Sequence, residues 1–264
     1  MTCWSITKAG PCSNASRLLL PGTWRARPLN SAGRVLAAAL AGAALCPAVA
    51  RSGAEPATGP TADPAAHLAR LEAALLLQTL NAELLSHDSA TLTLERWCSG
   101  HHLASPARIS AVRAPDEAEQ PLTPAQREEL RVLPTDEVRH RKVRLSCGTL
   151  VLSEADNWYV PARLTAQMNH VLESSDTPFG LAVQALHFQR HTLSSDMLWQ
   201  PLPPGWEMQS RAAADDAGAL CFPAHLLQHR ALLTLPDGTP FSEVVETYTS
   251  NLLALPRFAG VPRC

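Results

Sequence analysis

Two strands joined by a turn are predicted by Val138-Arg-His-Arg-Lys-Val-Arg-Leu-Ser-Cys-Gly148 and the segment after it, Thr149-Leu-Val-Leu-Ser-Glu-Ala-Asp-Asn-Trp-Tyr-Val-Pro-Ala-Arg163. Successive side chains of a strand point to opposite faces, so Arg141 lies on the same face as Val143, Leu145 and Cys147. That face is apolar and is expected to be buried. Because a buried charge is costly unless it is paired, Arg141 needs a carboxylate or an anionic ligand.

A candidate partner for Arg141 lies in the later segment Phe241-Ser-Glu-Val-Val-Glu-Thr-Tyr248. If this segment is a strand, Glu246 falls between Val244 and Tyr248 on one face, among apolar neighbours. A functional site and a buried structural ion pair both remain open at this point, because ion-pair networks also bury charge.

Several segments resemble chorismate pyruvate-lyase and the chorismate-lyase-like superfamily, in the same order along the chain. The resemblance covers residues 64 to 255, and the family arginine is usually followed by Glu where this chain has Lys142. The matching pieces are Leu84-Leu-Ser-His-Asp-Ser-Ala-Thr91, Arg141-Lys-Val-Arg-Leu145, Asn157-Trp-Tyr-Val-Pro-Ala-Arg163, Thr177-Pro-Phe-Gly180 and Val245-Glu-Thr247.

The resemblance implies a single α+β domain with an antiparallel sheet and flanking helices. It also implies a carbon–oxygen lyase of ubiquinone biosynthesis, which converts chorismate to 4-hydroxybenzoate and pyruvate without a cofactor or a metal. In that enzyme Arg141 would bind the ring carboxylate, since a planar guanidinium suits a bidentate contact. Glu246, with its pKa raised by apolar surroundings, would meet the ring hydroxyl and assist proton transfer.

The remaining site residues are also assigned by this resemblance. Main-chain N–H groups near Ala90, Phe179 and Gly180 would complete the anion site. Arg163 matches another family arginine, which either touches the ligand or supports the sheet through an ion pair with Glu154 or Asp156.

A binding module is the alternative from a different class of protein. A chain of this fold could hold a small aromatic carboxylic acid without turning it over, and it would need Arg141 more than Glu246. An exported protein with no small ligand is the third reading, in which neither residue lines a cavity.

The N-terminus has the basic, apolar and small-residue parts of an export signal. This composition bears on where the protein is located. Residues 1–54 contain no Asp or Glu, and five basic residues precede the apolar run Val35-Leu-Ala-Ala-Ala-Leu-Ala-Gly-Ala-Ala-Leu-Cys46. We therefore expect a leader over residues 1–50, a flexible linker over 51–63 and a periplasmic or secreted mature chain. An organellar transit peptide is the rival reading. The basic part is long for an export signal, so a later translation start, and with it a cytoplasmic protein, also remains open.

The composition of the chain limits its class and its partners. With 264 residues, 46% of them hydrophobic, the chain can bury one sizeable core. A net charge of −2 argues against a nucleic-acid partner held by bulk electrostatics. No membrane span is expected in the mature chain, and the expected oligomeric state is a monomer.

Spacing and capping residues give the remaining elements. We expect a helix from Pro64 capped by Asp63, a strand over Thr91–Cys98, a short helix opened by Thr123 and a helix after Thr165. The other expectations are a helix after Pro178 capped by Thr177, a loop or inserted flap over 187–222, a hairpin from His229 to Tyr248 and a tail over 256–264.

Cysteine and histidine residues are the candidate metal ligands of the chain. Cys98, Cys147, Cys221 and Cys264 follow the leader, and three disulfide pairings or free thiols are compatible with that count. His187 with His191, and Cys221 with His225 and His229, have ligand-like spacings. Such spacings are common by chance, so no metal site is expected.

Overall fold

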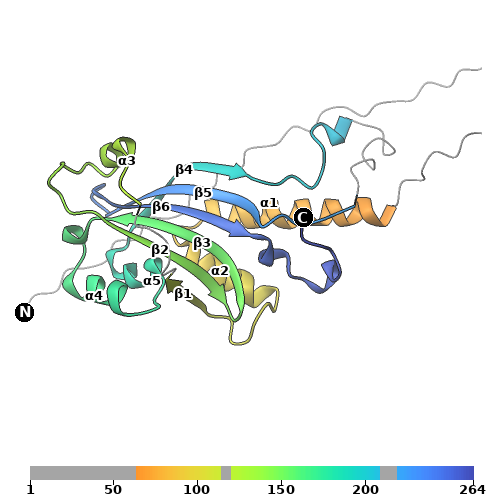
Figure 1. Cartoon of the computed structure of the whole chain (residues 1–264), viewed down its shortest axis with the longest axis horizontal. Helices are drawn as coiled ribbons and strands as arrows, with labels where there is room; N and C mark the ends of the chain where they lie inside the picture. Colours follow the sequence, from red (N-terminus) through yellow and green to blue (C-terminus); the bar gives the residue numbers. More distant parts are fainter. Residues whose placement is uncertain (1–63, 114–119, 209–218) are drawn as a thin grey trace, which may run out of the picture. The chain divides into compact units, whose positions relative to one another are not determined.

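The computed structural model describes residues 64–113, 120–208 and 219–264, which belong to one domain (Figure 1). The predicted leader, the predicted linker and the proposed helix cap Asp63 lie outside the described residues. None of the described helices is both long enough and apolar enough to cross a membrane.

A six-stranded antiparallel sheet forms the centre of the domain, in the order β1-β2-β3-β6-β5-β4. Together with helices on its faces, it confirms the predicted α+β class (Figure 1). The strands are β1 Ile109–Arg113, β2 Arg139–Cys147, β3 Leu150–Tyr159, β4 Gln189–Met197, β5 His225–Thr234 and β6 Pro240–Thr249.

The predicted hairpin around Gly148 is confirmed. Gly148 has a φ of 57°, a left-handed conformation that glycine adopts without strain, and a Cβ there would lie 2.8 Å from Ala104 Cβ. Arg141, Val143 and Leu145 are all buried on one face, opposite Asn157, Ala155 and Ser153 of β3. The alternation in β2 therefore identified the inward-facing side chains.

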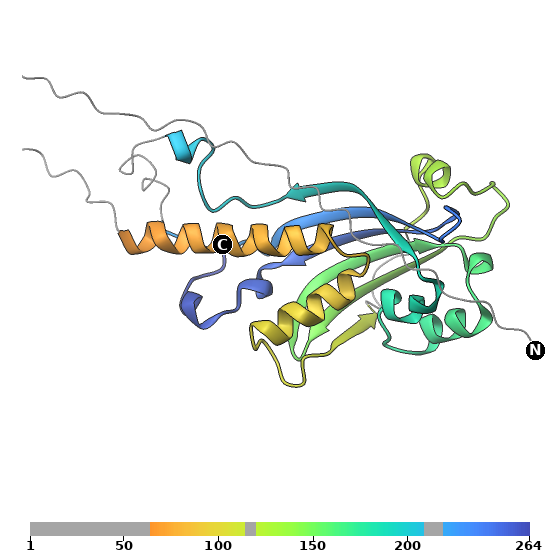
Figure 2. The same ribbon diagram turned by 180° about the vertical axis from the view of Figure 1, so that it is seen from behind.

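Two helices cover the face of the sheet that carries Arg141 (Figure 2). The predicted helix from Pro64 is confirmed as α1 Pro64–Leu85, which buries Ala73, Leu77, Leu80 and Leu84 against the sheet. The second helix, α2 Ala90–Gly100, packs beside it. This inner face holds the larger core of the domain.

The strand predicted over Thr91–Cys98 is wrong, because these residues form α2. Ser89 caps the helix by accepting a hydrogen bond from Leu92 N at 3.3 Å. Leu94, Trp97 and Cys98 then fall on one buried helical face, and Trp97 Nε1 donates to Leu252 O at 3.1 Å. The cap and this spacing outweigh the short alternation of apolar and polar residues.

The segment between α2 and β2 contains one strand that the sequence did not indicate, β1, at the edge of the sheet. It also contains the predicted capped helix, α3 Pro124–Glu129, whose capping box joins Thr123 and Gln126. Helix α3 lies on the outer face, where Gln126 Nε2 donates to Glu243 Oε1 at 3.3 Å. A small separate core of Leu130, Val132, Trp158 and Val160 accompanies it.

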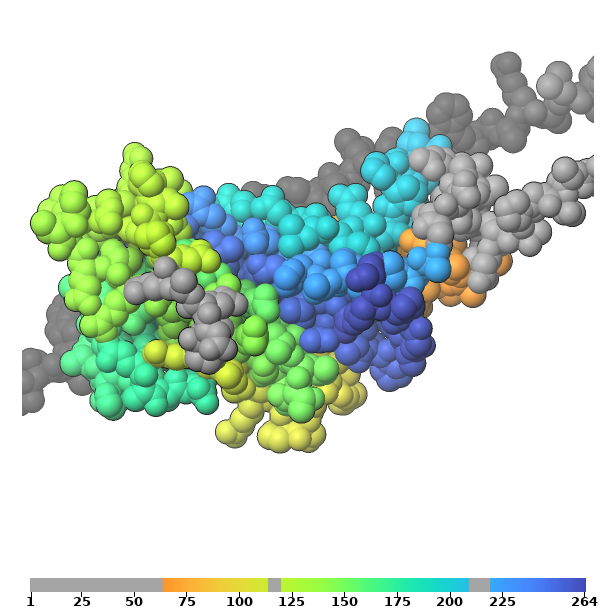
Figure 3. Space-filling view, viewed as in Figure 1, coloured from red at the N-terminus to blue at the C-terminus, as the bar shows by residue number. Residues whose placement is uncertain are grey.

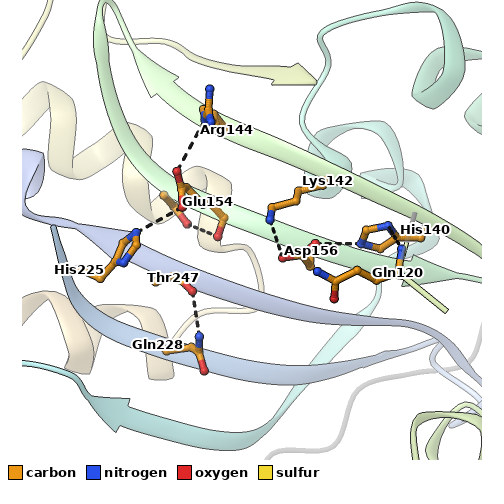
Figure 4. Close-up of polar contacts among 10 residues, drawn as sticks. Gln120, His140, Lys142, Arg144, Glu154, Asp156, His225, Gln228 and Thr247 are labelled. Carbon is orange, nitrogen blue, oxygen red and sulfur yellow. Dashed lines mark hydrogen bonds and ion pairs between the residues drawn. The ribbon is translucent and has the colours of Figure 1, made fainter. Parts of the chain in front are cut away.

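The outer face of the sheet is largely polar. Asp156 lies 2.8 Å from His140 Nε2 and 3.9 Å from Lys142 Nζ, and Glu154 contacts Arg144 and His225 (Figure 4). In the space-filling view, the strands that carry these side chains form much of the visible surface (Figure 3). Because few apolar groups lie here, the inner face is the side on which a pocket can be enclosed.

Two predictions for the chain after β3 need correction. The helix predicted after Thr165 is confirmed as α4 Ala166–Ser174, with Thr165 as its cap. The next helix is only α5 Phe179–Ala182, its cap residue is Pro178 and not Thr177, and a 3₁₀ turn, η2 Gln184–Leu186, follows. The predicted flap over 187–222 is wrong in its first part, because β4 pairs with β5 along its length.

The C-terminal residues and the cysteines pack onto the domain. Disulfides join Cys98 to Cys147 and Cys221 to Cys264. Residues 256–264, predicted as a tail, include the buried Phe258, and Phe222 N donates to Pro262 O at 3.0 Å.

Candidate functional site

A pocket lies between the inner face of the sheet and the first residues of α2 and α5. It contains about 470 Å³ of space not filled by protein atoms, part of it open to solvent. Its lining residues are Asp88, Ser89, Ala90, Thr91, Arg141, Val143, Leu145, Ala155, Asn157, Phe179, Gly180, Phe188, Arg190, Leu233, Val244 and Glu246. Five of the six residues predicted for the site are among them.

Arg141 is the charged group at one end of this pocket. The residue is 5% exposed, and its Nη2 donates to Thr177 O at 3.1 Å. Its Nε and Nη1 atoms are buried and have no hydrogen-bond partner among the described residues. Burial, and then the charge of Arg113, lower the pKa of the Arg141 guanidinium to about 10. The structure therefore holds a buried cation with two nitrogen atoms, Nε and Nη1, that donate to none of the described residues.

Backbone N–H groups lie beside Arg141. Ala90 and Thr91 begin α2, and Phe179 and Gly180 begin α5, where N–H groups have no acceptor within their own helix. The two segments approach closely, because a Cβ on Gly180 would lie 3.1 Å from Ser89 Oγ. The predicted site residues Arg141, Ala90, Phe179 and Gly180 are thus brought together around one end of the pocket.

Glu246 lines the same pocket, but its partner is not Arg141. Arg190 Nη2 donates to Glu246 Oε2 at 2.6 Å, and the two side chains are 4% and 7% exposed. The hydroxyl of Tyr248 donates to the same oxygen at 3.1 Å. Glu246 therefore does not have the apolar surroundings that its position in the strand predicted.

The electrostatics of the Arg190–Glu246 pair follow from burial and charge. Burial lowers the pKa of the Arg190 guanidinium, but Glu246, Tyr248 and Asp88 more than offset this, so the pKa is raised. Burial, and then the charge of Glu246, raise the pKa of the Tyr248 hydroxyl well above its ordinary value. Both groups are therefore hydrogen-bond donors to Oε2 of Glu246, which leaves Oε1 as the acceptor available to the pocket.

The pocket walls between these two polar ends are mostly apolar. Strands β2 and β6 are separated by β3, so Arg141 and Glu246 arise from backbones about 10 Å apart. The side chains that fill the walls between them are Val143, Leu145, Phe179, Phe188, Leu233 and Val244. This arrangement suits a flat apolar molecule with a polar group at each end.

Arg163 does not line the pocket. Its Nη1 donates to Leu130 O at 2.6 Å and also to Pro240 O, and its Nη2 donates to Arg131 O at 3.0 Å. The alternative of an ion pair with Glu154 or Asp156 is also wrong, because those carboxylates pair with other cations of the outer face. Arg163 ties three stretches of backbone together and is a structural residue.

The histidine and cysteine spacings do not form a metal site in the described residues, where no cluster of three or more potential ligands occurs. Cys221 is bonded to Cys264. His229 is buried, with Nε2 2.7 Å from Asn81 Oδ1 and 3.0 Å from Ser195 Oγ. These contacts connect α1 to strands β4 and β5.

Sequence reasoning did not identify Arg190 or Tyr248 as part of the site. Arg190 was missed because its segment was predicted to be a loop. Phe188 and Arg190 are separated by Gln189 and would share one face of a strand. This spacing was the available signal for an inward-facing arginine. Tyr248 was placed on the correct face of its strand, but its hydrogen bond to Glu246 depends on the side-chain rotamers.

Fold and site together define an α+β domain whose pocket contains a buried arginine that forms no ion pair with the described residues. No protein-family model matches the chain. The uncharacterized protein y4mC of Sinorhizobium fredii is 50% identical over 193 residues, which are 73% of this chain and 81% of that protein. The chain belongs to the same family as y4mC.

Similar solved structures include regulators of transcription. The effector domain of PhnF from Mycobacterium smegmatis is 13% identical, with a TM-score of 0.39 over 62% of this chain and 90% of that chain. A GntR-family transcriptional regulator from Enterococcus faecalis is 10% identical, with a TM-score of 0.29 over 54% of this chain and 90% of that chain. YydK of Bacillus subtilis is 14% identical, with a TM-score of 0.33 over 55% of this chain and 59% of that chain.

Proposed function

We propose that the pocket binds a small aromatic carboxylic acid that carries a hydrogen-bond donor at the end opposite its carboxylate. The observation that carries this proposal is the state of Arg141, which is buried and whose Nε and Nη1 donate no hydrogen bond to the described residues. A carboxylate placed against the guanidinium can accept hydrogen bonds from its free N–H groups and neutralise the charge. The neighbouring N–H groups of Ala90 and Gly180 add further donors to the same anion.

The far end of the pocket sets the second requirement. Oε2 of Glu246 already accepts hydrogen bonds from Arg190 and Tyr248, so Oε1 is the atom that a ligand meets. A carboxylate oxygen accepts hydrogen bonds, so it favours a ligand hydroxyl over an ether or a second carboxylate. With apolar walls between, 4-hydroxybenzoate is the simplest molecule that meets all three conditions.

Chorismate pyruvate-lyase activity is the second candidate, and the position of Glu246 opposite Arg141 favours it. In this reaction the bond between ring C3 and the ether oxygen breaks, and the hydrogen on C4 leaves as a proton. The ring becomes 4-hydroxybenzoate, and the enolpyruvyl group gains a proton at its methylene carbon to become pyruvate. In our proposal Arg141 holds the ring carboxylate and Oε1 of Glu246 holds the C4 hydroxyl.

We also propose that the mature protein is exported. The leader-like composition of residues 1–54 supports this location. Two disulfides within the described residues support it as well, because disulfides persist in oxidising compartments. In such a compartment, binding a small aromatic acid requires no supply of chorismate, which favours the binder over the lyase.

The test measures binding and turnover on the same full-length protein. Titration calorimetry with 4-hydroxybenzoate is expected to give saturable binding, weakened about 100-fold in Arg141→Ala because charged hydrogen bonds are lost. Arg144→Ala is the matched control, since this arginine lies on the same strand but faces outward. Benzoate and 4-methoxybenzoate are expected to bind more weakly than 4-hydroxybenzoate, and Glu246→Gln to reduce that preference.

The outcomes separate the two candidates. Equimolar release of 4-hydroxybenzoate and pyruvate from chorismate, lost in Arg141→Ala and in Glu246→Gln, would establish the lyase. Arg141-dependent binding without turnover would establish the binder. Unchanged 4-hydroxybenzoate affinity in Arg141→Ala would contradict both.

A further inference from the structure

A second hollow adjoins the pocket on the side of α2 and η2. It contains about 630 Å³ of space, part of it open to solvent, and we call it the vestibule. Four residues line both the pocket and the vestibule: Asp88, Ser89, Gly180 and Phe188. The other vestibule residues are His87, Leu92, Arg96, Gln184 and His187. These shared residues form the boundary between the two spaces.

The boundary is narrow, and Gly180 lies in it. A Cβ on Gly180 would lie 3.1 Å from Ser89 Oγ, closer than most side-chain contacts, and 3.4 Å from Thr91 Oγ1. Phe188, which is buried, forms another part of the boundary. Gly180 therefore packs closely against Ser89, and a side chain at this position would crowd the boundary.

Two further hollows of the described residues differ from the vestibule in their relation to the pocket. The two grooves beside Trp199 lie between α1 and the segment after β4, and they share no lining residue with the pocket. Of these three hollows, the vestibule is the one that shares lining residues with the pocket.

The vestibule is lined by one arginine, Arg96, and one carboxylate, Asp88. Arg96 is exposed, and its Nη2 donates to the neutral Thr93 Oγ1 at 3.0 Å. Among the described residues no carboxylate forms an ion pair with Arg96. The one carboxylate of the vestibule, Asp88, accepts a hydrogen bond from Arg190 N at 3.1 Å. A cation at the entrance raises the local concentration of anions and their association rate.

We propose that ligands reach the pocket through the vestibule, past Gly180, and that Arg96 attracts anionic ligands to this entrance. The proposed function supplies only the identity of the molecule that passes. The route itself can be tested without any ligand, so the two proposals can fail separately.

The test measures how fast a thiol placed inside the pocket reacts with small reagents. Ala155→Cys in the full-length protein introduces the thiol, because Ala155 lines the pocket but not the vestibule. The reagents are a negatively charged and a positively charged methanethiosulfonate of similar size. Mass spectrometry of the peptide containing position 155 separates this reaction from that of other cysteines in the chain.

Blocking the entrance is expected to slow both reagents. Gln184→Trp adds bulk at an exposed position of the vestibule rim, and we expect labelling to slow about tenfold, because a steric barrier lowers a rate exponentially. Gln200→Trp makes the same change beside Trp199 and is expected to leave the rate unchanged. Gly180→Ala is expected to slow labelling as well, and thermal unfolding identifies any variant that is not folded.

The role of Arg96 is read from the charge of the reagent. Arg96→Gln is expected to slow the negative reagent several-fold relative to the positive one, and added salt is expected to remove the difference. The proposed entrance is contradicted if Gln184→Trp leaves the labelling rate unchanged, or if the Ala155→Cys thiol is not labelled at all. Equal rates for the two reagents in the parent and in Arg96→Gln overturn the role of Arg96.

Discussion

Arg141 shows, at the scale of single residues, a conflict between stability and binding. Its guanidinium is buried, makes one hydrogen bond to Thr177 O and has no carboxylate partner among the described residues. Burial of such a charge costs free energy, which is why the pKa of Arg141 is lowered. A residue that destabilises the empty domain is compatible with a binding role, because a bound anion recovers the cost.

Replacing Arg141 by methionine tests this conflict. Methionine fills a similar length of space without charge, so Arg141→Met is expected to raise the free energy of unfolding by about 1 kcal/mol or more. The same variant is expected to lose binding of 4-hydroxybenzoate. Urea denaturation measures the first effect and titration calorimetry the second.

The control for this variant is Arg144→Met, which removes an exposed arginine from the outer face of the same strand. Its free energy of unfolding is expected to change by no more than about 0.5 kcal/mol. If Arg141→Met were less stable than the parent, the guanidinium would contribute to folding through contacts other than those described.

The limits of sequence-based prediction are clear for these same residues. Alternation was enough to place Arg141 and Glu246 on the buried face, because strand geometry fixes the direction of every second side chain. It could not pair them correctly, since the partner of Glu246 depends on which strand lies next to β5. Arg190 belongs to that strand, β4, and its segment has few of the apolar residues that mark a strand.

At the scale of elements, the pocket depends on how α2 is held against β2. The Cys98–Cys147 disulfide joins the last turn of α2 to the end of the strand that carries Arg141. The N-terminal residues of α2 provide Ala90 and Thr91 to the pocket. This disulfide therefore fixes two parts of the site relative to each other, whereas Cys221–Cys264 lies away from the pocket.

Removing each disulfide in turn separates stability from binding. The bonded cysteines are 49 and 43 residues apart, so loss of either loop constraint is expected to lower the free energy of unfolding by about 4 kcal/mol. Only the double variant Cys98→Ala, Cys147→Ala is also expected to weaken 4-hydroxybenzoate binding. Calorimetry at low temperature, where both variants are folded, makes the comparison with Cys221→Ala, Cys264→Ala. Equal affinities in the two variants would contradict a role for Cys98–Cys147 in the site.

Helix α2 also shows why some elements could be predicted from the sequence and others could not. Long helices with regular apolar spacing, such as α1, and the hairpins around Gly148 and Gly238 follow from local sequence. The segment Thr91–Cys98 satisfies a strand pattern and a helix pattern over its short length. Ser89 decides between them through its cap, and the bond between Cys98 and Cys147 favours packing of one helical face. Contacts between distant residues therefore settled what the local pattern left open.

At the scale of the whole molecule, the two faces of the sheet have different roles. The outer face carries charged and polar side chains in a network of ion pairs (Figure 4). The inner face carries the larger core and the pocket, and α1 and α2 cover it (Figure 2). Polar contacts in this covered layer connect Asn81 of α1 to His229 and Ser195 of the sheet. The pH dependence of folding is expected to originate there.

His229 belongs to β5, the strand between β4 and β6, and it is fully buried on the side that faces α1. Its Nε2 contacts Asn81 and Ser195, and its Nδ1 has no partner among the described residues. Burial lowers the pKa of His229 from 6.5 to about 4, while the charge of Glu246 raises it, that of Arg190 lowers it and that of Asp196 raises it. The neutral imidazole is therefore the form that the folded protein accommodates.

The sign of the pH effect follows from this lowered pKa. Between pH 6.5 and pH 4 the unfolded chain binds a proton at His229 that the folded protein does not bind. The contribution of His229 to the free energy of unfolding is fully present above pH 6.5. It decreases as the pH falls to about 4, by about 3 kcal/mol in total. Urea denaturation at a series of pH values is expected to show this loss in the parent. His229→Gln keeps a donor for Asn81 but does not titrate, so its free energy of unfolding is expected to lack this part of the pH dependence. Parallel plots of the free energy of unfolding against pH for the two proteins would show that His229 is solvated enough to titrate normally.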